Sequence, residues 1–279
     1  HEERSFVGFG RAARHQLGAV AGDTLITEEW FHAGLGDQRS LRGKVYQLEL
    51  RSGDGQRFED TSTTWQISLP ATLVAHPHTG IAVRTQQIQA IFEGEATAKT
   101  LQTTWVHNQQ GDPVETRRLG EDDAAGDEQI IRQSYIYVSQ DYHLWGLEYE
   151  RSVHALDETI VHKSQFLFDG EMQPLPAGRA TRGWLRVRRD WLESQQRWVE
   201  QEANDYDEFG NVVRAYHEGV WRLVDYDEDG VFALAEHIEP QPGRRLTTRA
   251  QWHPVLGTMT RYTDTADVEQ VISYDGLGR

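Results

Sequence analysis

A short motif, Tyr-Asp-x-x-Gly, recurs along the chain and constrains its fold more than any other sequence feature. It stands at Tyr206–Gly210, Tyr226–Gly230 and Tyr274–Gly278, and in a weaker form at Trp252–Gly257, where the turn is one residue longer. The aromatic starts lie 20, 26 and 22 residues apart, which is the size of one β-hairpin with its connection. The segment His107–Gly111 fits the same frame, with His for Tyr and Asn for Asp.

The chemistry of the motif is that of a hairpin turn. An Asp carboxylate accepts hydrogen bonds from backbone N–H groups two residues on, and the Gly supplies the positive φ that closes the turn. The Tyr precedes the turn, where rings of successive hairpins stack across neighbouring strands. The sequence therefore predicts a structural repeat motif without a catalytic role, formed by Tyr206, Asp207, Gly210, Tyr226, Asp227, Gly230, Tyr274, Asp275 and Gly278.

Alternating polar and apolar residues predict short strands elsewhere in the chain. Lys44–Leu50 shows this alternation and is followed by the turn-forming residues Ser52–Gly55. Similar patterns occur at Ile81–Phe92, Ile130–Val138 and Thr159–Phe168. Nine Trp, ten Tyr and nine Phe residues with 25 Gly also suit strands joined by glycine turns. The expected fold class is all-β, a strip of repeated antiparallel β-hairpins.

One stretch also fits a helix. Trp184, Trp191 and Trp198 recur every seven residues, the spacing of one helix face. A hairpin with its turn at Glu193–Gln196 fits equally well with the β-like flanks, and we favour it over the helix. The tryptophans then pack across strands, and a platform for stacking sugars or nucleobases is the functional alternative.

Composition divides the chain into three regions. Residues 1–118 are expected to form an N-terminal β-hairpin region, and residues 119–129 an exposed acidic loop that contains five acidic residues. Residues 130–279 are expected to form a hairpin strip, with clear repeats from Asp205 and a truncation within a repeat at Arg279. The segment Asp169–Gly183 interrupts regular pairing through its prolines and glycines.

Charge and hydropathy exclude several partners. Lys and Arg total 28 against 44 Asp and Glu, a formal net charge of -16, so we expect no nucleic-acid partner and no binding to anionic membranes. No run of eighteen apolar residues is present, which argues against direct membrane insertion. Cysteine is absent, which removes disulfides and thiolate chemistry.

Motifs for catalysis and cofactor binding are missing from the sequence. There is no G-x-S-x-G elbow, no HExxH pair and no phosphate-binding loop, so we expect no enzyme activity and no cofactor. The closest histidine pair, His76 and His78, has no third ligand at a suitable spacing. The repeated aspartates Asp205, Asp207, Asp225, Asp227 and Asp229 could suit calcium, although capping of their own turns is the favoured interpretation.

Several landmarks follow one another in a recognisable order. They are Glu3–Arg11 (ERSFVGFGR), Trp30–Gly34 (WFHAG), Phe168–Gly170 (FDG) and Thr181–Leu185 (TRGWL), followed by the Tyr-Asp repeats. This order resembles the YD, or RHS, repeat family, and within it the middle region of the B component of insecticidal toxin complexes and related bacterial virulence proteins. The sequence departs from the family pattern at Val231 and Asp267, where hairpins are less strongly predicted.

The resemblance implies a function that the residues alone do not. Such proteins form elongated, curved strips of hairpins that spiral into a hollow shell around a toxic C-terminal segment. It implies that this chain is a structural segment of a large exported toxin or virulence protein, located outside the cell. Its partners would be the remaining repeats, the enclosed toxic segment and other toxin-complex subunits. The alternative is a cell-surface adhesion or carbohydrate-binding module of YD repeats.

Overall fold

The structure, a computed structural model, consists mainly of β-strands. It describes residues 9–18, 24–68, 80–92, 95–121, 126–137, 146–170, 180–217, 219–241 and 243–275. Eighteen strands form an antiparallel sheet, and the helical content of these ranges is limited to two short 3-10 segments, η1 (Gly36–Leu41) and η3 (Glu193–Gln195). The prediction of an all-β chain of antiparallel hairpins is therefore confirmed. The histidine pair at 76–78 lies outside the described residues.

The chain is organised as two compact units, residues 1–134 with 151–162, and residues 135–150 with 163–279. Each is described by itself here, as unit 1 and unit 2. The division into residues 1–118, 119–129 and 130–279 stays a prediction. Strand β7 runs to Glu121, β8 begins at Gln129, and residues 122–125 of the expected acidic loop are outside the described ranges.

Unit 1 contains a meander in which each strand pairs with the next in sequence. Its strands are β1 (Arg11–Leu17), β2 (Thr24–Phe31), β3 (Val45–Ser52), β4 (Arg57–Ser68), β5 (Ile81–Ile91), β6 (Lys99–His107) and β7 (Pro113–Glu121), and β7 pairs with the start of β8 (Gln129–Ile136). The predicted strand at Lys44–Leu50 and its turn are thus β3 and the β3–β4 connection.

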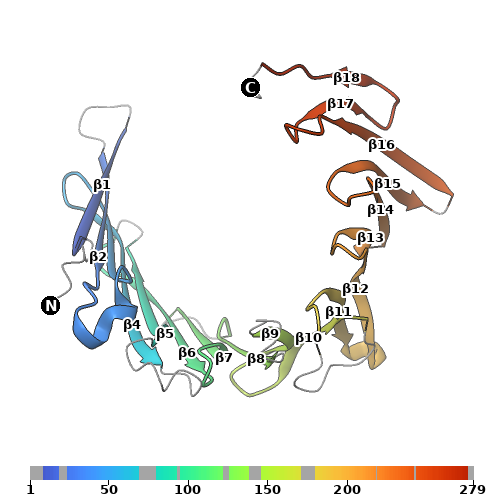
Figure 1. Ribbon diagram of the computed structural model, residues 1–279. Helices are drawn as coiled ribbons and strands as arrows, with labels where there is room; N and C mark the ends of the chain where they lie inside the picture. The colour runs from blue at the N-terminus through green and yellow to red at the C-terminus, as the bar shows by residue number, and fades with distance from the viewer. Residues whose placement is uncertain are drawn as a thin grey trace. The chain divides into compact units, whose positions relative to one another are not determined.

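Unit 2 continues with the same pattern of paired neighbours. Its strands are β11 (Leu185–Leu192), β12 (Arg197–Tyr206), β13 (Val212–His217), β14 (Val220–Tyr226), β15 (Ala233–Gln241), β16 (Arg244–Trp252), β17 (Met259–Thr263) and β18 (Glu269–Val271). Strand β11 also pairs with β10 (Ile160–Phe168). Strands β9 (Leu147–His154) and β10 each have residues assigned to unit 1 and residues assigned to unit 2. Figure 1 shows the hairpins of each unit following one another in chain order.

The tryptophan-rich stretch is a hairpin, and the helix alternative is wrong. Strands β11 and β12 are joined by the three-residue η3 turn, and Gln196 closes it with a φ of 49°. Trp191 and Trp198 lie directly opposite each other, with ring centroids 5.4 Å apart in an edge-to-face arrangement. Their seven-residue spacing thus comes from a cross-strand pair, which stabilises a sheet much as an i,i+4 pair stabilises a helix.

Few apolar side chains of the described residues are fully buried, and they are found in both units. In unit 2, Ile136, Phe168 and Ala180 form a buried cluster against which Leu147, Tyr149, Phe166 and Leu185 pack. In unit 1 the buried apolar side chains are Ile26, Leu41, Val83 and Ile130. Most strand residues are only half-buried, because a sheet with water on both faces buries few side chains completely.

Candidate functional site: the repeated hairpin turn

The turn after β12 shows what the Tyr-Asp-x-x-Gly residues do. Asp207 Oδ1 accepts hydrogen bonds from the backbone N–H groups of Phe209 and Asn211, both at 2.9 Å. Its other oxygen accepts the side-chain amide of Asn211 at 3.0 Å. Gly210 has a φ of 94°, a conformation that disfavours residues with a Cβ. Burial alone would raise the pKa of the Asp207 carboxyl, but these hydrogen bonds lower it below its ordinary value.

The turn after β14 repeats this geometry with one extra residue. Asp227 Oδ1 accepts the backbone N–H groups of Val231 at 2.8 Å and Phe232 at 3.0 Å, and Gly230 has a φ of 66°. The pairing register shifts immediately before Tyr226, as it does before Tyr206. The departure at Val231 is therefore accommodated by lengthening the turn, and the β14–β15 hairpin is intact.

The same turn, with a side-chain acceptor three residues before a residue of positive φ, occurs elsewhere, including two places outside the last third of the chain. Asn108 Oδ1 accepts the backbone N–H groups of Gln110 and Asp112, and Gly111 has a φ of 92°. Ser52 Oγ accepts the N–H of Gln56 in the β3–β4 turn. Near the C-terminal end, Asp264 Oδ1 accepts the N–H groups of Ala266 and Val268. The Ser52 turn was not predicted to belong to this group of turns. The sequence pattern that identifies it is a serine three residues before Gly55.

Asp267 takes the place of glycine in the β17–β18 turn. Its φ is 59°, and its N–H donates to the carbonyl of Asp264 at 3.1 Å. Asp tolerates this left-handed conformation better than most residues because its short side chain hydrogen-bonds locally. The hairpin therefore forms despite the departure from the motif.

Asp169 anchors a much longer connection in unit 2. It follows Phe168 at the end of β10, in the position that Asp207 has after Tyr206. Its carboxylate accepts backbone N–H groups from four consecutive residues, 181 to 184, at 2.6 to 3.3 Å. The sequence landmarks Phe168–Gly170 and Thr181–Leu185 are thus joined through the Asp169 side chain.

The aromatic residue of the motif lies at the strand end and packs inward. Tyr206 donates its hydroxyl to the carbonyl of Leu185 at 2.8 Å, and its ring lies 5.1 Å from that of Trp184. Burial raises the pKa of the Tyr206 phenol. Tyr226 and Tyr274 are half-buried, Asp275 is exposed, and Gly278 lies outside the described residues.

Successive turns in unit 2 contact one another through their glycines. A Cβ built on Gly210 would lie 3.1 Å from the Trp184 ring, and one built on Gly230 would lie only 2.4 Å from the Phe209 ring. Asn211 also donates its side-chain amide to the carbonyl of Gly230 at 2.7 Å. Glycine is thus required at each of these positions for two reasons. It adopts the positive φ, and its lack of a Cβ leaves room for the aromatic ring of the preceding turn.

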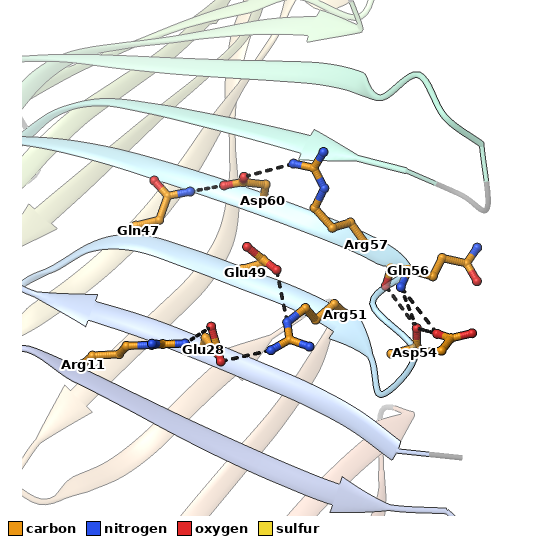
Figure 2. Close-up of polar contacts among 10 residues, drawn as sticks. Arg11, Glu28, Gln47, Glu49, Arg51, Asp54, Gln56, Arg57 and Asp60 are labelled. Carbon is orange, nitrogen blue, oxygen red and sulfur yellow. Dashed lines mark hydrogen bonds and ion pairs between the residues drawn. The ribbon is translucent and has the colours of Figure 1, made fainter. Parts of the chain in front are cut away.

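Cross-strand polar contacts link the strands of unit 1. Glu28 is buried on β2 and pairs with Arg11 of β1 at 2.7 Å and with Arg51 of β3 at 3.2 Å (Figure 2). The hydrogen bond from Arg11, supported by Arg51, holds the pKa of Glu28 below its ordinary value against the opposing effect of burial. Further along, Gln47 and Arg57 both contact Asp60. Arg132 similarly bridges Glu115 and Glu158.

The described tryptophans lie against cations or other aromatic rings. All eight are half-buried, and each has a cation or another ring against it. The covering partners are Arg11 on Trp30, Lys44 on Trp65, Arg84 on Trp105, Tyr206 and Arg182 on Trp184, Trp191 and Trp198 on each other, Tyr216 and Arg214 on Trp221, and Phe232 on Trp252.

Ligand-binding features are sparse in the described ranges. One hollow beside a repeat turn has a volume of about 340 Å³ and is lined by Asp169, Gly170, Thr181, Arg182, Trp184, Arg186 and Tyr206. Another, of about 390 Å³, is lined by Arg197, Trp198, Val199, Glu200, Tyr216 and Trp221. Within these ranges no group of three His, Asp or Glu residues is placed to hold a metal ion. Asp205 pairs with Arg186 and Arg214, and Asp225 pairs with His237, so neither joins the turn aspartates. No helix in this part of the protein is both long and apolar enough to cross a membrane.

Comparison with known proteins gives a clear fold relationship. No family model matches the chain, and no curated protein matches it in sequence. Among solved structures, the TcdB2-TccC3-Cdc42 crystal structure matches with a TM-score of 0.70 and 13% identity, over 99% of this chain and 20% of that one. The chain therefore shares the fold of TcdB2-TccC3 over almost its whole length, which supports its resemblance to RHS/YD-repeat proteins.

Two further structures support the assignment to this fold. A Tc holotoxin pore from Photorhabdus luminescens and TcdB2-TccC3 without its hypervariable C-terminal region each match with a TM-score of 0.71, 13% identity and 99% coverage of this chain. The chain spans about a fifth of the length of each of these matched proteins. At this identity the similarity concerns the fold, so function is argued separately.

Proposed function

We propose that the chain is a structural segment of a hollow β-shell, which encapsulates and helps deliver the toxic C-terminal part of a large exported toxin or virulence protein. The observation that carries the proposal is the fold similarity to TcdB2-TccC3 over 99% of the chain. Asp207 and Asp227 support a structural role, because both accept backbone hydrogen bonds from their own turns. In this role the chain is not an enzyme and acts outside the cell.

The proposed partners follow from the same role. They are the remaining repeats of the same large protein, its enclosed toxic segment and other toxin-complex subunits. The matched structures are complexes by their names, TcdB2-TccC3 and TcdB2-TccC3-Cdc42, which supports a role in an assembly. Adhesion or carbohydrate binding is less favoured, because stacking on a sugar requires a free aromatic face and each described tryptophan already has a cation or another ring against it.

Protease protection tests the shell. In the full protein that carries this chain, the C-terminal segment is expected to be cleaved at least about tenfold more slowly than the same segment expressed alone, because opening of a folded wall limits access. Denaturant that unfolds the repeats should abolish the difference. Equal cleavage rates of the enclosed and the isolated segment would refute encapsulation, while binding to a glycan array with loss on substitution of Trp184 would favour the adhesion alternative.

A further inference from the structure

Three turns of unit 2 form one continuous edge. They connect β12 to β13 (207–211), β14 to β15 (227–232) and β16 to β17 (253–258). The Phe209 ring lies against Gly230 of the second turn, and the Phe232 ring approaches Gly257 of the third, at 4.0 Å from a Cβ built there. Phe232 also stacks on Trp252 with ring centroids 5.5 Å apart. We call these three segments the turn edge.

The turn edge exposes apolar side chains that a solvated turn does not need. Phe209 is 58% exposed, Val231 63%, Val255 84% and Leu256 46%. Single exposed apolar residues are ordinary on protein surfaces, but here each of three neighbouring turns carries at least one. Exposed apolar side chains gathered on neighbouring turns are a feature of interaction surfaces.

The same edge carries negative charge without a compensating cation. Its three segments contain Asp207, Glu208, Asp227, Glu228 and Asp229 but no Lys or Arg. Asp207 and Asp227 accept backbone hydrogen bonds, whereas Glu208, Glu228 and Asp229 are exposed and make no ion pair with any described residue. Apolar side chains flanked by free carboxylates complement a surface on which apolar and cationic side chains alternate.

We propose that the turn edge of unit 2 is a docking surface for a basic amphipathic segment of a partner polypeptide, one in which lysine or arginine alternates with apolar residues. The apolar tips would bury against the partner's apolar face, and Glu208, Glu228 and Asp229 would pair with its cations. Polyanions are repelled by this edge, and a neutral apolar partner would leave the carboxylates desolvated and unpaired. The inference does not depend on whether the chain encloses a toxic segment.

Fluorescence anisotropy with a labelled peptide that alternates lysine with leucine tests the proposal on the whole chain. The peptide is expected to bind, and a peptide that alternates lysine with serine is expected to bind about tenfold more weakly. The triple variant Glu208→Gln, Glu228→Gln, Asp229→Asn should weaken binding of the leucine peptide about tenfold. The pair Val231→Thr, Val255→Thr should weaken it to a similar extent without any change of charge.

Matched variants elsewhere in unit 2 separate docking from general attraction to an acidic protein. Glu193→Gln, Glu200→Gln, Asp267→Asn removes the same number of charges, and Val268→Thr, Val271→Thr removes the same methyl groups; each should change the affinity by less than about twofold. Three results would overturn the proposal. They are equal effects of the two charge triples, equal affinity of the two peptides, and a self-associating chain that the turn-edge variants convert to a monomer, which would assign the edge to a second copy.

Discussion

Asn108 and Asp207 occupy the same place in turns of different units, yet only one of them is charged. In both turns a single oxygen, Oδ1, accepts the backbone N–H groups two and four residues on. Asp264 does the same. The turn therefore needs an acceptor atom at a fixed place and does not need a carboxylate charge, which explains why asparagine can replace the aspartate of the motif.

Substitution of Asn108 measures the contribution of that acceptor. We expect Asn108→Ala to lower the free energy of unfolding by about 1 kcal/mol, because two backbone donors lose their protein partner and must be solvated. Asn108→Asp should cost less than half as much, since Oδ1 is retained. Urea denaturation of both variants provides the measurement. Equal losses for Ala and Asp would show that the side-chain acceptor contributes nothing and that Gly111 alone closes the turn.

Glu28 is a residue whose contribution should depend on pH. Its folded-state pKa is depressed, chiefly by the hydrogen bond from Arg11, so its stabilisation is fully present above its unfolded pKa, about 4.3, and is lost as the pH falls through the folded value. Glu28→Gln should therefore lower the free energy of unfolding by about 1 kcal/mol at pH 7, with the difference shrinking below pH 4. Urea denaturation at several pH values tests this, and a pH-independent difference would contradict the charge-based explanation.

At the scale of elements, the contact between neighbouring turns is the feature most open to test. Gly230→Ala introduces a Cβ both at positive φ and at 2.4 Å from the Phe209 ring, whereas Gly219→Ala meets nothing within 4 Å at a φ of 87°. We expect Gly219→Ala to cost roughly 1–2 kcal/mol from backbone strain alone, and Gly230→Ala to cost more.

A double-mutant cycle isolates the contact. Phe209→Ala combined with Gly230→Ala should recover the excess cost of Gly230→Ala over Gly219→Ala, because the ring that the new methyl group displaces is then absent. Thermal unfolding of the four variants gives the coupling free energy. Strictly additive effects of Phe209→Ala and Gly230→Ala would mean that the two turns do not restrain each other.

The hairpins were predictable from local patterns, but the contacts between them were not. Alternation and turn residues are properties of one segment, so β3, β5, β8 and β10 follow from the sequence. The Phe209–Gly230 contact and the capture of residues 181–184 by Asp169 join positions that local patterns do not relate. Ser52 was missed as a turn acceptor because serine and glycine are common in ordinary loops. The ion pairs of Glu28 with Arg11 and Arg51 depend on the register in which the three strands pair. Alternation alone predicts that register only approximately.

At the scale of the whole molecule, the chain leaves unusually much surface in contact with water. Its accessible area is 18484 Å² for a mass of 32.0 kDa, whereas a compact monomer of that mass would expose roughly 12,000 Å². Relative to an unfolded chain of roughly 46,000 Å², folding therefore buries about four-fifths of the area that a compact protein would bury. Most strand residues are only half-buried, so side chains on both faces of the strands remain accessible to water.

This exposure should be visible in the heat capacity of unfolding. A compact protein of 279 residues is expected to show a ΔCp of roughly 3 to 4 kcal/mol/K, and this chain should fall about one-fifth lower because ΔCp follows the apolar area exposed on unfolding. Calorimetry at several protein concentrations gives the value, with a globular monomer of similar length as the control. A ΔCp at or above the compact-protein value would mean that the sheet covers one of its faces in solution. If that cover came from another copy, the melting temperature would rise with protein concentration, because association stabilises the folded chain by mass action.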